Sequence, residues 1–191
     1  MPALKDLSED KNWRIKLSVV EQYPALAKQL GEQFFTEKLV QICLNWLNDN
    51  VYSIRMAAID NFKELTKIFG SAWCERNVLK KLLEMRLEQN YLYRLTTLFG
   101  IAELSEVLNM QIVKKSFIPV LQQTSKDKIP NIRMNVAKTI HKIRKKLYSA
   151  QVTQVESQID QELIQILNDL KGDEDDDVKF FTRKAFTDIN K

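Results

Sequence analysis

The apolar positions of this 191-residue chain follow helical spacing, and the pattern as a whole returns every 39 residues. In each copy, apolar side chains stand one position before a basic residue and seven and ten positions after it, which keeps them on one helix face. These positions are Ile15, Ile54, Tyr93, Ile132 and Val178, then Tyr23, Phe62, Ile101, Ile140 and Phe186, then Leu26, Leu65, Leu104, Ile143 and Ile189. The pattern predicts an amphipathic helix in each copy, which we call helix B.

A second amphipathic segment precedes helix B, and we call it helix A. Its apolar positions are Phe35, Cys74, Val113 and Ile159, then Leu39, Val78, Phe117 and Leu163, then Cys43, Leu82, Leu121 and Leu167. Helix B is expected to end at Gly31, Gly70 and Asn109, each with a positive φ. A period of this length is typical of an α-helical repeat array. We predict an all-α fold, an α-α superhelix, in which residues 1–191 form one array of about four and a half repeats, approximately 1–31, 32–70, 71–109, 110–148 and 149–191.

Charged residues keep the same period. The basic residues are Lys16, Arg55, Arg94, Arg133 and Lys179, and the acidic residues six positions before them are Asp10, Asp49, Glu88, Asp127 and Asp173. A spacing of six does not place two side chains side by side on one helix. We therefore expect the acid of one repeat to face the base of the next, in a ladder that fixes the stacking of the repeats. The alternative is that these charges are simply solvated.

The turns between helices A and B carry unexpectedly large side chains. Turns ordinarily favour small polar residues, yet the positions three and two before the basic residue hold Trp13 and Arg14, Tyr52 and Ser53, Tyr91 and Leu92, Pro130 and Asn131, and Asp176 and Asp177. Exposed aromatic and Arg side chains at such intervals favour a partner-binding edge. The alternative, which is strongest for Tyr91 and Tyr93, is that each aromatic folds over its own helix pair.

Composition narrows the class of protein but does not define its function. The net charge is only +4, and the basic run Lys138–Lys146 is offset by the acidic run Asp173–Asp177, so strong nucleic-acid binding is not indicated. We expect the basic run to lie on the solvated face of helix B and the acidic run, which lacks the glycine and final glutamate of a calcium loop, to form a turn.

Candidate chemistry is sparse. His141 is the only histidine, and Cys43 and Cys74 both fall on apolar helix A positions, so we expect buried reduced thiols and no metal or cofactor. No catalytic motif is apparent, and the sequence indicates a protein that is not an enzyme. No apolar run is long enough to span a bilayer and the first residues do not resemble a leader, so we expect the cytoplasm, with the nucleus also open.

The Asp and Arg phasing resembles the HEAT repeat. More specifically, the segments DKNWRIKLSVVEQYPALAKQLGEQFF, WLNDNVYSIRMAA, NYLYRLTTLFGIAELSEV, NIRMNVAK and DDVKFF are similar, in this order, to the C-terminal repeats of the scaffolding A subunits of type 2A protein phosphatases. The resemblance implies a non-catalytic scaffold that binds a phosphatase catalytic subunit through the turns between helices A and B. It implies partner contacts at Trp13, Arg14, Tyr52, Tyr91, Leu92, Ile129 and Asn131, with Asp176 and Asp177 in the equivalent fifth turn. Regulatory subunits are not expected to bind through this segment alone.

Two departures from the regular pattern stand out. The step into the last repeat is 46 residues rather than 39, and the seven extra residues fall between Leu147 and Leu163. We expect a lengthened fifth helix A, which either overhangs the array or reaches a partner. The chain also begins with only the end of a helix A, which suggests either a fragment of a longer scaffold or a short relative.

Two rival functions remain at this stage. One is a HEAT-like nucleic-acid enzyme of the DNA glycosylase type, supported by the basic run and the aromatic residues. The other is a transport or adaptor array, which would share the fold but not the segments quoted above.

Overall fold

The computed structural model describes residues 6, 8, 10–148 and 154–187. Helices joined by short turns make up these residues. They divide into two compact units, Met1–Glu84 and Met85–Lys191. Each unit is described by itself.

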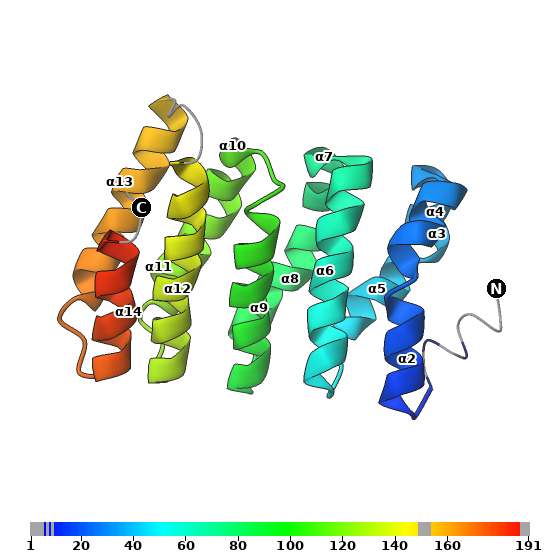
Figure 1. Ribbon diagram of the computed structural model, residues 1–191, viewed down its shortest axis with the longest axis horizontal. Coiled ribbons are helices and arrows are strands. Elements are labelled where there is room, and N and C mark those ends of the chain that lie inside the picture. The colour runs from blue at the N-terminus through cyan, green and yellow to red at the C-terminus, as the bar shows by residue number, and fades with distance from the viewer. Residues whose placement is uncertain (1–5, 7, 9, 149–153, 188–191) are drawn as a thin grey trace. The chain divides into compact units, whose positions relative to one another are not determined.

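The first unit begins with a helix B in two pieces, α2 (Trp13–Val20) and α3 (Tyr23–Leu30). The next repeat has a helix A in two pieces, α4 (Glu32–Lys38) and α5 (Val40–Trp46), and one long helix B, α6 (Tyr52–Phe69) (Figure 1). A further helix A completes the unit and consists of α7 (Ser71–Cys74), the π-helical turn η1 (Glu75–Leu79) and α8 (Lys80–Glu84). Both α2 and α3 pack against α6.

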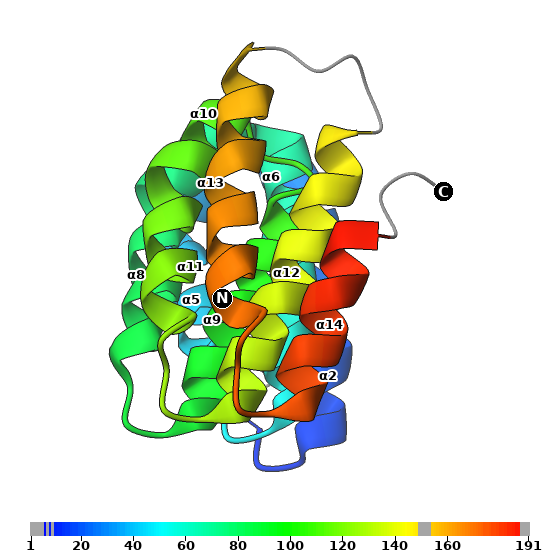
Figure 2. The ribbon, with the colours of Figure 1, turned by 90° about the vertical axis from the view of Figure 1, so that its left-hand side faces the viewer.

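The second unit starts with a short 3₁₀ turn, η2 (Met85–Leu87), and helix B α9 (Tyr91–Leu104). The following helix A comprises α10 (Met110–Ile112), the π-helical turn η3 (Val113–Phe117) and α11 (Ile118–Thr124), and its helix B is α12 (Pro130–Leu147). The last pair is α13 (Gln154–Leu170) and α14 (Asp176–Thr187). In Figure 2, α11 and α13 form one layer of this unit, and α12 and α14 lie side by side in the other.

The apolar stripe of helix A is buried throughout. All twelve helix A positions named from the sequence are at most 1% exposed, from Phe35 to Leu167. Helix B follows its predicted stripe less strictly: Tyr93, Leu26 and Phe186 are only half-buried, and Ile15 is 41% exposed. Ile189 lies outside the described residues. The prediction of paired amphipathic helices is therefore confirmed, with the weakest burial on helix B.

Two glycines end helix B as predicted. Gly31 has φ 80° and Gly70 has φ 90°, a conformation that residues with a Cβ rarely adopt. The same prediction is wrong for Asn109, whose φ is −61°. The Asn109 side chain instead accepts a hydrogen bond from the Gln111 amide at 2.8 Å and caps the start of α10.

A proline divides the first helix B. In an unbroken helix the amide of residue 24 would donate to the carbonyl of residue 20, but Pro24 has no amide hydrogen. α2 accordingly ends at Val20 and α3 begins at Tyr23. Asn61 on α6 replaces the missing donor, since its Nδ2 lies 2.6 Å from the Val20 carbonyl oxygen.

Helix A is irregular at one repeated position. Leu39 separates α4 from α5 with φ −122°, and Val78 and Phe117, the same position in the next two repeats, both lie in π-helical turns. π-Turns insert one residue into a helix and bend it locally. The irregularity was not predicted, because the apolar spacing passes through this position without interruption.

The fifth helix A begins earlier than its counterparts. α13 starts nine positions before Leu163, whereas α4, α7 and α10 start seven positions before Leu39, Val78 and Phe117. Within the described residues, the predicted lengthening therefore amounts to at least two residues. The remainder of the insertion includes residues 149–153, which lie outside the described residues.

The basic run on α12 departs from the expectation of a solvated face. Lys145 is exposed, but Arg144 is buried, with its Nε 2.6 Å from Asp160 Oδ1 and its Nη1 2.6 Å from the Ala185 carbonyl oxygen. Tyr148 completes this cluster by donating to Asp160 Oδ2 at 2.7 Å, and this bond raises the pKa of the phenol. The expectation was wrong for Arg144 because α13 and α14 pack against α12 and supply the acceptors.

Two neighbouring lysines of the run are also engaged by protein groups. Lys142 Nζ lies 2.5 Å from Glu103 and 2.7 Å from Glu106. Lys146 Nζ donates to the carbonyl oxygen of Ser105 at 2.6 Å, and burial lowers the pKa of its ammonium group. These contacts join the end of α12 to the end of α9.

Cys43 and Cys74 are buried free thiols, as predicted. Burial raises the pKa of the Cys74 thiol to about 11 and raises that of Cys43 as well. His141 is half-buried on α12.

Over the described ranges, no group of three or more His, Cys, Asp or Glu side chains is arranged to hold a metal ion. Among the same residues, no helix is both long and apolar enough to cross a bilayer.

Candidate functional site

Among the described residues, three ion pairs between the predicted ladder acids and bases connect neighbouring repeats within the two units. In the first unit Lys16 Nζ lies 2.8 Å from Asp49 Oδ2. In the second unit Arg94 binds Asp127 through two bonds of 2.7 and 3.0 Å. Arg133 binds Asp173 in the same way, at 2.6 and 2.8 Å. The paired side chains are 6–19% exposed.

The direction of pairing is the reverse of the one expected from the sequence. Each base meets the acid of the following repeat, so Asp49 pairs with the preceding Lys16 rather than with a base further along the chain. This direction follows from a second set of hydrogen bonds, which the arginines make within their own repeats. Because Arg94 and Arg133 each donate through Nη1 to carbonyls of their own turns, their Nε and Nη2 donors are left to bind the acid of the next turn.

The basic side chains hold their own turns through backbone carbonyls. Arg94 Nη1 donates to the carbonyl oxygens of Glu88 and Gln89, both at 2.9 Å. Arg55 makes the equivalent bonds to Asp49 at 2.8 Å and Asn50 at 3.2 Å, and Arg133 donates to the Asp127 carbonyl at 2.8 Å. The spacing of six residues thus places the basic side chain within hydrogen-bonding distance of the acidic residue's backbone carbonyl. The sequence analysis did not predict this bond.

The acidic side chains fix the other half of each turn. Asp49 Oδ1 accepts from the amide of Val51 at 2.8 Å, and Asp127 Oδ1 accepts from the amide of Ile129 at 2.9 Å. Asp10 and Asp173 accept in the same way from Asn12 at 2.7 Å and from Asp175 at 2.9 Å. An Asp that bonds the amide two residues on is a common turn-forming device. Because this Asp recurs at the same position of four repeats, the sequence already contained the information needed to predict these turn bonds.

The ion pair between Arg133 and Asp173 shifts the pKa values of both side chains. The hydrogen bond from Arg133 holds the pKa of Asp173 below its usual value, and the Asp175 amide acts in the same direction. The same bond raises the pKa of Arg133. Charge-assisted, two-pronged bonds of this kind are among the stronger polar interactions in proteins.

The remaining predicted ladder residues are not described as such pairs. Arg55 and Glu88, the base and acid of two consecutive repeats, belong to different units, and each unit is described by itself. Lys179 pairs with Asp176 at 2.6 Å within α14.

In the first unit, the predicted partner-binding residues stand at the starts of α2 and α6. Asn12 caps α2 by accepting from the Arg14 amide at 3.1 Å, and the Arg14 guanidinium lies 4.6 Å from the centre of the Trp13 ring. Trp13 is half-buried and Arg14 is exposed. Tyr52, the first residue of α6, is 55% exposed. These side chains are therefore held at the helix starts and are accessible to a partner.

In the second unit, Tyr91 and Leu92 open α9 and are 38% and 40% exposed. Asn90 caps this helix by accepting from the Leu92 amide at 3.0 Å. The alternative that Tyr91 caps the core is not favoured by this exposure, whereas Tyr93 is half-buried.

The other two turns of this unit are more polar. Ile129 is half-buried before α12, and Asn131 is exposed with its Oδ1 accepting from Asn135 at 2.9 Å. Asp176 and Asp177 are exposed at the start of α14. In Figure 1 the starts of α9, α12 and α14 lie at one end of the unit, the lower end in this view.

Comparison with known proteins bears on both fold and family. Residues 39–69 match the model of the HEAT repeat. The chain is 39% identical over 128 residues to the regulatory A subunit of protein phosphatase PP2A from Saccharomyces cerevisiae, a match that covers 66% of this chain and 20% of that protein. It is 45% identical over 67 residues to the protein of the same name from Schizosaccharomyces pombe, which covers 35% of this chain and 11% of that protein. The chain thus spans a fifth or less of the length of these relatives.

Solved structures support the same fold. A designed armadillo repeat protein in complex with the peptide (KR)4 has a TM-score of 0.57 at 14% identity, covering 99% of this chain and 81% of that one. A computationally designed armadillo repeat protein for modular peptide recognition has a TM-score of 0.54 at 15% identity, covering 96% and 79%. At such identities the likeness concerns the fold alone. Together with the sequence matches, it makes this chain a HEAT-repeat protein homologous to the regulatory A subunits of protein phosphatase PP2A.

Proposed function

We propose that this chain is a non-catalytic scaffold segment that binds the catalytic subunit of a type 2A protein phosphatase through its turns between helices A and B. The observation that carries the proposal is the exposure of large side chains at the starts of helix B. Tyr52, Tyr91 and Leu92 are 38–55% exposed at positions where turns ordinarily carry small polar residues. The homology to PP2A regulatory A subunits supports the identity of the partner.

The turns are rigid enough to present these side chains. Four of the turns are closed by an Asp that accepts a backbone amide, and three turns, including the one before Tyr91, are held by an Arg that donates to the turn carbonyls. A binding surface that is ordered before the partner arrives loses less conformational entropy on association. The ion pairs therefore contribute to binding indirectly, by holding the turns.

Trp13 and Arg14 form the strongest single contact candidate in the first unit. The guanidinium lies over the indole at 4.6 Å, so both side chains share one position and orientation. Trp and Arg are the residue types that most often dominate interface energies. An interface of standard size, roughly 1,600 Å², contains only a few such residues.

The first prediction tests this assignment by measuring capture of the phosphatase catalytic subunit. We expect Trp13→Ala/Arg14→Ala to weaken binding by about 2 kcal/mol or more, roughly thirtyfold, because truncation removes a ring and a cation from the contact. The measurement is a titration of wild type and variant with the purified catalytic subunit. The matched control is Lys28→Ala/Lys80→Ala, which changes two exposed residues on α3 and α8. Equal affinities of wild type and the Trp13 variant would remove these residues from the site.

The alternative hypothesis, a nucleic-acid enzyme, is disfavoured by the contacts that the basic run Lys138–Lys146 makes within the protein. Lys142, Arg144 and Lys146 are bound by carboxylates or carbonyl oxygens of the protein. A phosphate-binding groove needs several cations that are available to the backbone of the nucleic acid.

A further inference from the structure

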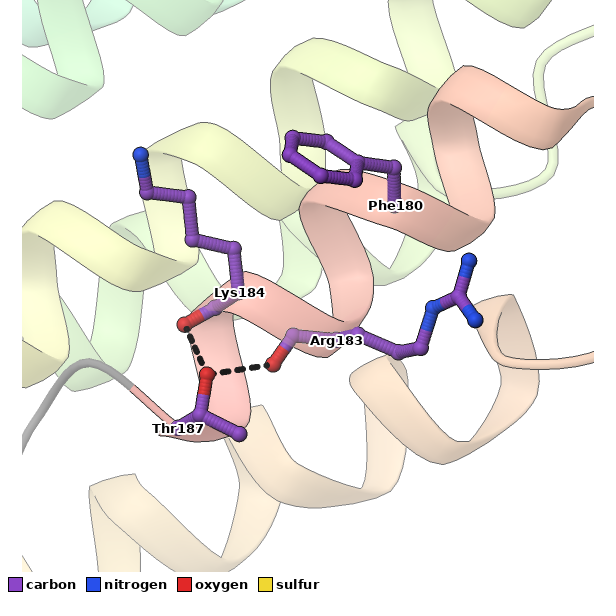
Figure 3. A pocket seen from close by; sticks show the side chains of 4 residues that line it. All are labelled: Phe180, Arg183, Lys184 and Thr187. Atoms are coloured by element: carbon purple, nitrogen blue, oxygen red, sulfur yellow. Dashed lines mark hydrogen bonds between the residues drawn. The ribbon is translucent and has the colours of Figure 1, made fainter.

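Two large apolar side chains among the described residues of the second unit are more than half exposed, Leu87 at 64% and Phe180 at 55%. Phe180 packs edge-on against Phe181 of its own helix, with ring centres 5.2 Å apart, and lines a hollow of about 530 Å³ with polar and charged side chains of α14 (Figure 3). Single exposed apolar residues among polar neighbours are common on protein surfaces. Leu87 differs from Phe180 because the large side chains exposed beside it are apolar.

Leu87 opens a run of six exposed residues, 87–92, that leads into α9. The run contains two more large apolar side chains, Tyr91 and Leu92, which are 38% and 40% exposed. The turn η2, which carries Leu87, lies against α9, which carries the other two. We call Leu87, Tyr91 and Leu92 the third-turn apolar patch. The exposed polar residues 88–90 give it the polar border that protein interfaces commonly have.

The repeat pattern does not require a leucine at this position. Leu87 stands seven positions before Arg94, and the corresponding residues of the other four repeats are polar or small: Glu9, Asn48, Lys126 and Gly172. Such residues are the ones that surface turns ordinarily favour. The apolar character of position 87 is therefore a property of this one turn. A partner that covered Leu87 would bury apolar area that the fold leaves in water.

The backbone on both sides of Leu87 is held in place within the second unit. On one side, Arg86 Nε donates to Gln123 Oε1 of α11 at 2.8 Å. On the other side, Arg94 Nη1 of α9 donates to the Glu88 carbonyl oxygen at 2.9 Å. A partner that covers the Leu87 side chain therefore does not have to order the turn as well, which lowers the entropy cost of association.

We propose that Leu87 is a further contact residue for the phosphatase catalytic subunit, and that the third-turn apolar patch receives apolar side chains of that subunit. The inference rests on the proposed function, which assigns Tyr91 and Leu92 to this partner. Leu87 continues the same exposed edge, so the partner that covers Tyr91 and Leu92 is the natural occupant. An apolar counterpart fits the patch, because burying an unpaired charged or polar group against apolar side chains is costly.

The test titrates the full chain with the purified catalytic subunit by isothermal titration calorimetry at several temperatures. Leu87→Asn introduces the residue that the preceding repeat has at this position. We expect it to weaken binding about threefold or more and to make the heat-capacity change of binding less negative, because less apolar area is buried. Leu87→Met keeps the apolar area and is expected to bind within about twofold of wild type.

Leu30→Asn is the matched control, since it makes the same exchange at a leucine that is 41% exposed at the end of α3, away from the turns between helices A and B. We expect its affinity to stay within about twofold of wild type. Urea unfolding verifies that the variants keep the stability of the wild type.

The outcomes separate this inference from the proposed function. Failure of the wild type to bind the catalytic subunit would overturn both. If the wild type binds and Trp13→Ala/Arg14→Ala weakens binding while Leu87→Asn does not, only the role of Leu87 is overturned. Equal losses in Leu87→Asn and Leu30→Asn would also overturn it, because the effect would then not depend on position.

The alternative occupant is a second copy of this chain, which sedimentation velocity of the chain alone detects. Self-association that Leu87→Asn abolishes, with no change in affinity for the catalytic subunit, would overturn the proposal in favour of that second copy. A wild-type chain that stays monomeric at the concentrations of the titration supports the catalytic subunit as the occupant.

Discussion

At the residue scale, single positions of the repeat carry distinct physical tasks. Gly70 adopts a positive φ that ends helix B, and its amide still donates to the Thr66 carbonyl at 2.8 Å. Asp173 combines a turn bond to the Asp175 amide with a two-pronged bond to Arg133. Each of these positions predicts a measurable consequence of substitution.

Gly70→Ala is expected to destabilise the first unit by about 1–2 kcal/mol, because a positive φ is unfavourable for an L-residue with a Cβ. The space around an added Cβ is open at Gly70, so the loss reports backbone strain and not a clash. The measurement is urea unfolding followed by circular dichroism. The matched control is Gly172→Ala, where an added Cβ also meets open space and φ is not in the positive range. Equal stabilities of the two variants would show that φ is not the cause.

Asp173→Asn is expected to lower the free energy of unfolding by about 2–3 kcal/mol at pH 7, because it breaks a mostly buried ion pair. The folded-state pKa of Asp173 is depressed, so its contribution is fully present above the unfolded pKa of about 4 and is lost as pH falls through the lower folded value. The gap between wild type and variant should therefore narrow as the pH falls below about 4.

Urea unfolding at pH 7 and at about pH 3 measures this gap. Asp169→Asn, at an exposed residue of α13, is the control. A gap of constant size at both pH values would contradict the role assigned to the carboxylate.

At the scale of elements, helices compensate for one another's irregularities. Pro24 removes the amide that would bond Val20, and Asn61 of the neighbouring α6 donates to that carbonyl at 2.6 Å. Thr139, the corresponding residue of α12, approaches the Leu98 carbonyl of α9 at 3.4 Å in the second unit. A polar residue at this position of helix B therefore serves the preceding helix B.

Asn61→Ala is expected to cost about 1–3 kcal/mol, because it leaves a buried carbonyl without its donor. Pro24→Ala restores an amide hydrogen next to that carbonyl, so Asn61→Ala should cost less than about half as much in the Pro24→Ala background. A double-mutant cycle by urea unfolding measures the coupling. Asn45→Ala, at an exposed residue of α5, is the control with little expected effect. Additive losses would mean that Asn61 does not compensate for the proline.

At the scale of the whole molecule, each compact unit builds its own core from stacked helix pairs. Both cysteines lie in the core of the first unit, with 0% of their surface exposed. Repeat arrays derive their stability from such nearest-neighbour packing. The thiols therefore offer a probe of the first unit within the intact chain.

Neither native thiol is expected to react with a disulfide reagent in the folded chain, because the thiolate is the nucleophile and burial raises the pKa of both groups, that of Cys74 to about 11. Labelling should follow unfolding of the first unit as urea is raised. Ala72→Cys adds a thiol at a less buried position of α7 and should react much faster. If Cys43 or Cys74 reacted as fast as the added thiol in native buffer, the burial would be contradicted.

The sequence by itself determined the helix pairs, the buried face of helix A and the glycine turns at Gly31 and Gly70. These features follow from spacing within one repeat, where each residue meets neighbours a few positions away, and the repetition makes each one visible several times. The same spacing indicated the partner-binding side chains of the turns, whose role remains a prediction.

Only the tertiary structure decided which charges meet. Asp49 pairs with the preceding Lys16, Arg144 is buried by Asp160 and Ala185, and Asn61 completes α2 from another helix. It likewise showed that Asn109 caps a helix start and that Arg183 is exposed where earlier repeats bury an apolar residue. These outcomes depend on groups from 16 to 41 positions apart and on which neighbour covers each helix. Periodicity records the face of a helix but not the atoms that will lie opposite it.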